Sequence, residues 1–263
     1  MRLFRRKKPQ IGLALGGGAA RGIAHIGVLK VMEEFEIPVD TIAGTSVGSI
    51  IGALRAGGKT AREIQSFSEN IAWTKLLQLS FSGLGLAKTK RMEELVESIL
   101  GDLSIESLSI PFAAVAVDIG AFKEVIFTNG PVARAVRASS SIPGIFEPVM
   151  DGDRALVDGG VMNNLPTEVA RSLGADIVIA VDLNAGITVG DKPSNLFDIS
   201  YRSFAALMWN TSRNGRNSAD ILIEPDIGDI PYHDLGRADE LLAAGEAAAR
   251  TALEPLRRKF ARR

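Results

Sequence analysis

The sequence predicts an α/β fold in three layers, in which a largely parallel central sheet is covered on both faces by helices. Two observations support this. Short apolar runs of strand length alternate along the chain with longer segments of helical spacing. Such alternation is typical of parallel sheets, because each crossover between parallel strands needs a helix. The chain also has 263 residues, 46% of them hydrophobic, which is enough for one domain with a substantial core.

Each element can be assigned to a stretch of the chain. Seven apolar runs are predicted to be buried strands: Ile11–Leu15, Thr41–Ala43, Phe112–Val117, Val125–Phe127, Ala155–Val157, Ile177–Val181 and Ile221–Ile223. Helices are predicted in the intervals, at Gly22–Phe35, Val47–Ala56, Ala61–Ile71, Met92–Leu100 and Thr167–Leu173, and a final alanine-rich helix at Ala238–Leu253. We find no internal repeat. One domain is therefore expected over residues 11–255, between basic tails at 1–10 and 256–263.

Composition excludes several kinds of site and partner. The net charge of −1 gives no electrostatic reason to expect nucleic acid as a partner. The absence of cysteine excludes disulfides, thiolate catalysis and cysteine metal sites. Only two histidines are present, His25 and His233, and they lie far apart in the sequence. We therefore predict neither a metal ion nor a cofactor.

The chain ends carry most of the visible charge asymmetry. The basic residues there are most simply solvated, but they also suit weak adhesion to anionic lipid, at about 1 kcal/mol per residue near such a surface. The longest uncharged apolar stretch, Thr41–Leu54, is shorter than the roughly 20 residues that a membrane span requires. A cytoplasmic protein with at most peripheral membrane contact is expected.

Two segments are less regular. Trp73–Lys90 combines large apolar residues with glycines, which is typical of a mobile apolar flap. Residues 186–217 contain a stripe at helical spacing: Phe197, Tyr201, Phe204 and Met208. Core packing is the simplest interpretation of this stripe, and acyl-chain binding or an oligomer contact stays open.

A glycine-rich turn follows the first predicted strand. Gly16-Gly-Gly-Ala-Ala-Arg-Gly22 leads from Ile11–Leu15 into a helix that carries His25. Backbone N–H groups in such a turn point toward negative charge. The anion is either a phosphate that is held permanently, as in a nucleotide-binding protein, or an oxygen that becomes negative only during a reaction.

A serine motif favours the second interpretation. Gly44-Thr-Ser-Val-Gly48 matches the G-x-S-x-G nucleophile elbow and lies where that motif belongs, between a predicted strand and a predicted helix. A serine on so sharp a turn needs small neighbours, which Gly44 and Gly48 supply. Ser46 is therefore a candidate nucleophile.

The serine needs a base, and three residues are candidates. His25 follows the glycine turn and is most simply a structural histidine. His233 would complete the chain order Ser, Asp, His of the α/β-hydrolases. Asp158, in Asp158-Gly-Gly160, ends an apolar run, so that three glycine-flanked strand ends would meet at one edge of a parallel sheet.

Taken together, these motifs resemble the patatin-like phospholipase family, most closely its small single-domain bacterial members. The resemblance covers Ile11 to about Pro225 and also includes Arg137-Ala-Ser-Ser-Ser-Ile-Pro-Gly144. It implies a patatin-like three-layer fold and a lipid acyl hydrolase, of the phospholipase A or lysophospholipase type, that acts on a lipid acyl ester through an acyl-enzyme.

The resemblance also implies roles for individual residues. Ser46 would be the nucleophile and Asp158 the base of a Ser–Asp dyad. The backbone N–H groups of Gly17, Gly18 and Ala19 would form the oxyanion hole, and Arg21 would steady the substrate phosphate or the loop. Ala19 stands where the family usually has glycine, and it can serve if its dihedral angles stay in an allowed region.

Three alternatives remain open on the sequence. The first is a Ser-Asp-His triad that uses His233. The second is a dinucleotide-binding protein, which the glycine spacing disfavours although Asp40 lies about twenty residues on. The third is a non-catalytic regulatory protein that has kept the fold.

Overall fold

A mixed sheet forms the central layer of the computed structural model, which describes residues 8–70, 78–79, 84–185, 192, 196–232 and 234–261. Five neighbouring strands are parallel, in the order β10, β9, β1, β2 and β5. Their bounds are Ile221–Ile223, Ile177–Val181, Ile11–Leu15, Thr41–Thr45 and Phe112–Asp118. These strands leave their carboxyl ends at one edge, where the glycine-rich turn and Ser46 follow β1 and β2.

The remaining strands of this sheet are antiparallel to their neighbours. β6 (Lys123–Phe127) lies on one side of β5, and β8 (Arg154–Asp158) lies on the other, followed by β7 (Val149–Asp151). β8 occupies the same side of β5 as β2, because β6 fills the opposite side along the whole shared length. β2 and β8 therefore meet end to end beside β5.

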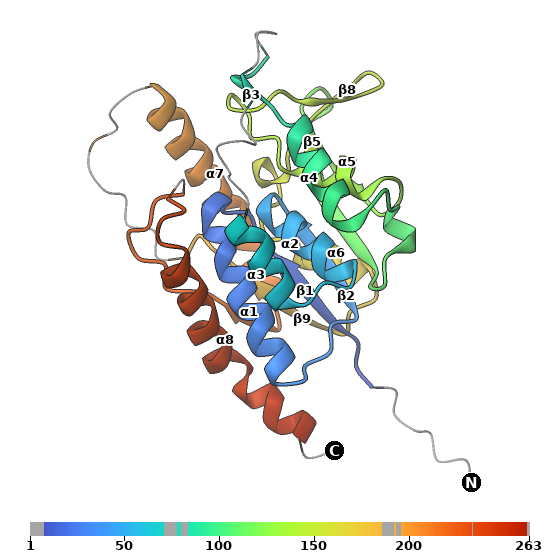
Figure 1. Ribbon diagram of the computed structural model, residues 1–263, viewed down its shortest axis with the longest axis vertical. Coiled ribbons are helices and arrows are strands. Elements are labelled where there is room, and N and C mark those ends of the chain that lie inside the picture. Colours follow the sequence, from blue (N-terminus) through green and yellow to red (C-terminus); the bar gives the residue numbers. More distant parts are fainter. Residues whose placement is uncertain are drawn as a thin grey trace.

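The described residues form eight helices: α1 (Ile23–Glu34), α2 (Val47–Ala56), α3 (Ala61–Asn70), α4 (Lys90–Leu100), α5 (Val132–Ser139), α6 (Thr167–Ser172), α7 (Leu196–Ser218) and α8 (Ala238–Ala261). Short 3₁₀ turns, η1 (Ala19–Gly22), η3 (Ile105–Ser107) and η4 (Gly159–Val161), join some of them. Helices α1, α3 and α8 lie together on the near face in Figure 1.

The two faces of the sheet differ in side-chain size. Large residues of β1, such as Leu13 and Leu15, face α1, α2 and α8 in the main core. The opposite face carries alanines such as Ala14 and Ala43, which pack against α6. A Cβ at Gly12 would lie only 2.5 Å from Ala175 Cβ, so small residues let this layer lie close to the sheet. The three-layer fold predicted from the sequence is confirmed.

The predicted elements are confirmed with shifted ends. Each of the seven predicted strands falls within an observed one, but β7 and the small hairpin of β3 (Gln78–Leu79) and β4 (Ala87–Lys88) were not predicted. Helix α8 continues through Pro255 to Ala261 instead of ending at Leu253. Much of the predicted flap, between Trp73 and Lys90, lies outside the described residues.

The predicted apolar stripe lies on α7. Phe204 and Met208 are buried there in a small cluster with Ile142 and Tyr232, which agrees with core packing. The side chain of Phe197 lies outside the described residues. In the described part of the chain, none of the helices combines the length and the apolar composition that crossing a membrane requires.

Candidate active site

Ser46 lies on a strained turn between β2 and α2. Its backbone has a φ of 55° and a ψ of −129°, and α2 begins at the next residue. A Cβ at Gly48 would lie 2.1 Å from the Leu15 carbonyl oxygen, and one at Gly44 would lie 2.4 Å from the Gly48 carbonyl oxygen. The two glycines therefore allow the close approach that this turn requires, as the motif predicts.

Asp158 reaches this turn from an antiparallel strand, which differs from the prediction that the three strand ends would belong to one parallel arrangement. Thr45, the last residue of β2, pairs with Val115, and Asp158, the last residue of β8, pairs with the next residue, Ala116. The carboxyl ends of β2 and β8 thus point at each other along β5. The predicted meeting of Ser46 and Asp158 is produced by strands that run in opposite directions.

The Asp158 carboxyl is fully buried, and in the described residues only one of its two oxygens accepts a hydrogen bond. Its Oδ1 accepts a hydrogen bond of 2.8 Å from the Gly160 N–H, whereas its Oδ2 has no partner in the described residues. Burial raises the pKa of this carboxyl to about 7, and the Ser46 hydroxyl and the Gly160 N–H oppose the rise. The Ser46 hydroxyl is therefore close enough to Asp158 to favour its ionised form. The distance and angles between the two side chains do not yet meet those of an ordinary hydrogen bond.

Two N–H groups of the glycine-rich turn have no acceptor in the part of the chain that the structure describes. The Gly16 N–H donates to the Val181 carbonyl (3.1 Å), and the Gly17 N–H donates to the Asn164 carbonyl (3.2 Å). The N–H groups of Gly18 and Ala19 have no acceptor among the described residues. Of the three predicted oxyanion-hole residues, Gly17 is therefore already engaged, and Gly18 and Ala19 are available.

Ala19 adopts a left-handed backbone conformation. Its φ is 50°, in the region that glycine tolerates best and that other residues occupy at a cost of about 1 kcal/mol or more. The conformation is allowed for alanine, so the departure from the family's glycine is compatible with this turn.

Two asparagine side chains donate hydrogen bonds to the glycine-rich turn. The Gly17 carbonyl accepts hydrogen bonds from Asn184 Nδ2 (3.0 Å) and, more weakly, from Asn164 Nδ2 (3.5 Å). The Tyr232 hydroxyl in turn donates to Asn184 Oδ1 (3.1 Å). The sequence predicts no role at the site for Asn164, Asn184 or Tyr232, because all three lie more than 140 residues from the turn.

Arg21 faces the protein interior. Its Nε and Nη2 donate to the Ile230 carbonyl at 2.9 and 2.7 Å, and its guanidinium lies 3.7 Å from the centre of the Tyr232 ring. Only 4% of the residue is exposed, and this burial lowers its pKa. Of the two roles predicted for Arg21, steadying the loop fits these contacts.

The histidines are placed differently. His25 is fully buried, and its Nε2 is 2.8 Å from the Gly16 carbonyl oxygen, so the ring donates from Nε2. Burial lowers its pKa to about 4, which keeps it neutral at pH 7. His25 thus supports the glycine-rich turn, in agreement with the structural role predicted for it. His233 lies outside the described residues.

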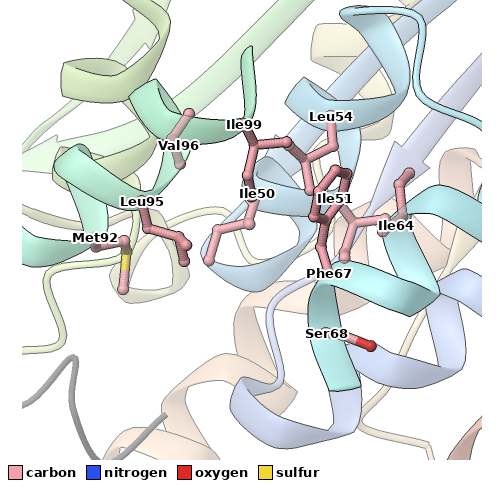
Figure 2. Close-up of a pocket in the computed structure, with 10 residues that line it drawn as sticks. All are labelled: Ile50, Ile51, Leu54, Ile64, Phe67, Ser68, Met92, Leu95, Val96 and Ile99. Atoms are coloured by element: carbon pink, nitrogen blue, oxygen red, sulfur yellow. The ribbon is translucent and has the colours of Figure 1, made fainter. Parts of the chain in front are cut away.

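An apolar pocket lies beside the helix that follows Ser46, between α2, α3 and α4. Figure 2 shows its lining side chains, which are Ile50, Ile51, Leu54, Ile64, Phe67, Ser68, Met92, Leu95, Val96 and Ile99. Ile50 lies one helical turn from Ser46 and donates its N–H to the Ser46 carbonyl at 3.3 Å. Of the described residues that line it, only Ser68 is polar, so the pocket is an apolar one. Within the described residues, no group of three or more acidic or histidine side chains could hold a metal ion.

Fold and site together define an α/β/α protein with a serine on a strained strand-to-helix turn, a glycine-rich turn and a buried aspartate. The family model described as Patatin-like phospholipase matches residues 13–171, which is more than half of the chain. The chain belongs to the patatin-like phospholipase family.

Curated relatives are similar over part of their length. An uncharacterized NTE family protein of Mycobacterium bovis is 37% identical over 187 residues, which are 70% of this chain and 52% of that protein. The human patatin-like phospholipase domain-containing protein 6 is 38% identical over 66% of this chain and 13% of its own length. Lysophospholipase nte1 of Aspergillus fumigatus is 31% identical over 94% of this chain and 18% of its own length. The chain thus spans about half, or much less, of the relatives it matches.

Solved structures support the fold. VipD from Legionella pneumophila superposes with a TM-score of 0.61 at 13% identity, over 94% of this chain and 67% of that one. The type III effector protein ExoU superposes with a TM-score of 0.54 at 16% identity, over 95% of this chain and 54% of that one. At these identities the similarity concerns the fold alone.

Proposed function

We propose that the protein is a serine lipid acyl hydrolase of the phospholipase A or lysophospholipase type, with Ser46 as nucleophile and Asp158 as base. The observation that carries this proposal is the end-to-end meeting of β2 and β8, which brings the strained Ser46 turn to a buried carboxylate, one oxygen of which has no partner among the described residues. Family membership and the names of the relatives, phospholipase and lysophospholipase, support a lipid ester as substrate.

The chemistry follows from the positions of these groups. Asp158 Oδ2 takes the proton of the Ser46 hydroxyl as Oγ attacks the ester carbonyl carbon. The resulting oxyanion accepts hydrogen bonds from the Gly18 and Ala19 N–H groups, each worth roughly 3–4 kcal/mol in the transition state. The leaving alcohol takes the proton from Asp158 as the acyl-enzyme forms. Water, deprotonated by Asp158, then attacks the acyl-enzyme carbonyl, and Asp158 returns that proton to Ser46 Oγ as the fatty acid leaves.

The raised pKa makes this assignment chemically reasonable. An exposed aspartate, with a pKa of about 3.9, is a weak base for a hydroxyl. Burial raises the pKa of Asp158 to about 7, close to the pH at which a general base works best while still ionised. The free Oδ2 then gains a hydrogen-bond donor when Ser46 approaches, which favours the proton transfer.

We also propose that lipid approaches the edge of the sheet beyond Asp158. Two hairpins, β5–β6 and β7–β8, extend past the site there. They carry three exposed apolar side chains, Ile119 (42% exposed), Phe122 (80%) and Met150 (56%). Ile119 is tied to the Asp158 strand, because its N–H donates to the Ala155 carbonyl at 3.1 Å. The last turns of α8, which carry Arg257 and Arg258, lie at the far end of the molecule (Figure 1).

Vesicle sedimentation tests which end meets lipid. On vesicles that contain phosphatidylglycerol, Phe122→Asp should weaken binding several-fold, whereas Arg258→Glu should leave it unchanged. The opposite order would show that the basic helix end makes the contact.

Ester hydrolysis tests the main proposal. The purified protein should hydrolyse p-nitrophenyl esters and release fatty acid from lysophosphatidylcholine, and Ser46→Ala should abolish both activities. Wild-type protein that hydrolyses no ester would support a non-catalytic role for the fold instead.

Two variants, His233→Ala and Asp158→Asn, test the role of His233. The dyad uses no histidine, so His233→Ala should hydrolyse esters at close to the wild-type rate. His25 cannot replace His233 as a base, because its Nε2 is bonded to the Gly16 carbonyl. A loss of several hundred-fold in His233→Ala, with Asp158→Asn equally impaired, would indicate a Ser-Asp-His triad.

A further inference from the structure

The motif Arg137-Ala-Ser-Ser-Ser-Ile-Pro-Gly144 includes the end of α5, and the chemistry above uses none of its residues. Within it, Ser139, Ser140 and Ser141 are all buried. The three serines lie beside the carboxyl ends of β2 and β8. Ser139 and Ser141 accept hydrogen bonds from the backbone N–H groups of the proposed dyad residues.

Ser139 bonds directly to the backbone of the proposed nucleophile. Its hydroxyl accepts a hydrogen bond of 3.0 Å from the Ser46 N–H and donates one of 2.6 Å to the Val115 carbonyl. A hydroxyl has a single proton, so the bond to Val115 fixes its direction and turns a lone pair toward Ser46. The side chain is fully buried, and water does not compete for either bond.

The bonded N–H belongs to a backbone that needs support. Ser46 has a φ of 55°, a conformation that persists in a non-glycine residue only where the surroundings hold it. Without the Ser139 hydroxyl, the Ser46 N–H would be buried with no acceptor on that side. The turn would then relax toward a conformation that moves the Ser46 hydroxyl.

Ser141 holds the other member of the dyad through its backbone. The Asp158 N–H donates to the Ser141 carbonyl at 2.9 Å. Ser139 and Ser141 are two residues apart, so the distance between the Ser46 and Asp158 backbones is set across a single turn of chain.

The turn is itself anchored. The Arg137 carbonyl accepts hydrogen bonds from the Ser141 hydroxyl (2.9 Å) and the Ser140 N–H (3.2 Å). The Arg137 guanidinium bonds to Thr89 Oγ1 (2.9 Å) and to Glu93 Oε2 (2.7 Å) at the start of α4. A rigid attachment to α4 thus keeps the serine turn in place.

We propose that Ser139 is a positioning residue, which holds the Ser46 turn in its strained conformation and, together with the Ser141 carbonyl, sets Ser46 against Asp158. This inference rests on the proposed function, because it assigns Ser139 to the geometry of the same dyad. Ser139 makes no contact with the reacting atoms and acts through the Ser46 backbone.

Ser140 supplies a matched control. It lies in the same turn and is also buried, but its Oγ has no partner in the described residues. Ser139→Ala should lower kcat about 10- to 100-fold with little change in KM, since small displacements of a reacting group cost rates of that order. Ser140→Ala should keep kcat within about twofold of wild type.

Two same-sized variants separate the hydroxyl from packing. Ser139→Thr keeps the hydroxyl and Ser139→Val lacks it, so any disturbance from the added bulk is common to both. The inference predicts a kcat at least tenfold higher for Ser139→Thr than for Ser139→Val. Equal kcat values in these two variants, or equal losses in Ser139→Ala and Ser140→Ala, would overturn it.

A readout that needs no activity separates this inference from the proposed function. Amide hydrogen exchange at Ser46 should be at least tenfold faster in Ser139→Ala than in wild type and unchanged in Ser140→Ala. If the wild type hydrolyses no ester but this difference in exchange is found, the proposed function fails and the positioning role of Ser139 holds. If exchange at Ser46 is unchanged in Ser139→Ala, the positioning role fails whatever the activity.

Discussion

Two regions of the molecule differ in backbone strain and in packing. One is the edge of the sheet that carries Ser46, and the other is the contact between α1 and α8. At the sheet edge, Ala19 and Ser46 have positive φ angles, and buried polar atoms such as Asp158 Oδ2 and Asn164 Oδ1 have no partner in the described residues. Between α1 and α8, the two helices pack closely. A Cβ at Gly245 would lie 2.0 Å from the Ala24 carbonyl oxygen, and one at Gly27 would lie 2.2 Å from that of Leu242.

The difference shows where stability is lost and where it is gained. Strained dihedral angles and unpaired buried polar atoms each cost roughly 1–3 kcal/mol. Apolar contact between helices offsets such costs, and ion pairs such as Lys30 with Glu246 and Arg250 with Glu34 border the contact (both 2.6 Å). These pairs are partly exposed and contribute little. Changes at the sheet edge should therefore alter activity, and changes between α1 and α8 should alter stability.

The largest effect is expected on activity at the sheet edge. Asp158→Asn should lower kcat for p-nitrophenyl esters by about 1,000-fold or more, because the amide cannot accept the Ser46 proton. Steady-state kinetics measure this directly, and thermal unfolding shows that the variant is folded. An Asp158→Asn enzyme with wild-type kcat would mean that another group is the base.

The same substitution should also increase the stability of the folded protein. The pKa of Asp158 is raised in the folded protein, so the folded state holds this proton more tightly than the unfolded state does. Wild-type stability therefore falls as pH rises from about 4 to about 7, by about 4 kcal/mol in all. The amide of the Asp158→Asn variant has no charge to bury, so its stability lacks this fall.

Chemical denaturation at two pH values measures this effect. At pH 8, the free energy of unfolding of Asp158→Asn should exceed that of wild type by a few kcal/mol, and near pH 4 the two should be similar. A difference that does not change with pH would contradict the burial of an ionised carboxylate.

A smaller effect is expected between α1 and α8. Gly245→Ala should lower the free energy of unfolding by about 1–3 kcal/mol, because its Cβ has no space beside the Ala24 carbonyl. The kcat of the folded variant should stay unchanged. Ala243→Ser, at an exposed position of the same helix, is the control and should be neutral within about 0.5 kcal/mol. A variant that loses kcat without losing stability would show that the two regions are coupled.

The smallest effect is expected at Ala19. Ala19→Gly relieves the left-handed strain but gives the unfolded chain more freedom, and the two effects partly cancel. The free energy of unfolding should change by less than about 1 kcal/mol, and kcat should stay within about threefold. A tenfold loss of kcat would assign the Ala19 methyl group a function that its backbone role does not require.

Features that neighbouring residues encode could be predicted from the sequence, and most contacts between distant segments could not. The strands, most helices and the Ser46 turn are encoded locally, by apolar runs and by Gly44 and Gly48. The encounter with Asp158 was predicted, but the antiparallel direction of β8 was not, because an apolar run reads the same for either direction. The roles of Ser139, Asn164 and Asn184 depend on segments far away in the chain, and single polar residues give no signal of such contacts.

The central claim is that Asp158, buried and with a pKa of about 7, activates Ser46. The most direct test is the pH dependence of fluorophosphonate labelling, followed by mass spectrometry of the labelled peptide. We expect Ser46 to carry the label, the rate of labelling to rise with a midpoint near pH 7, and Asp158→Asn to lose this rise. Labelling of another residue, or a rate at Ser46 that follows the same pH curve in Asp158→Asn as in wild type, would contradict it.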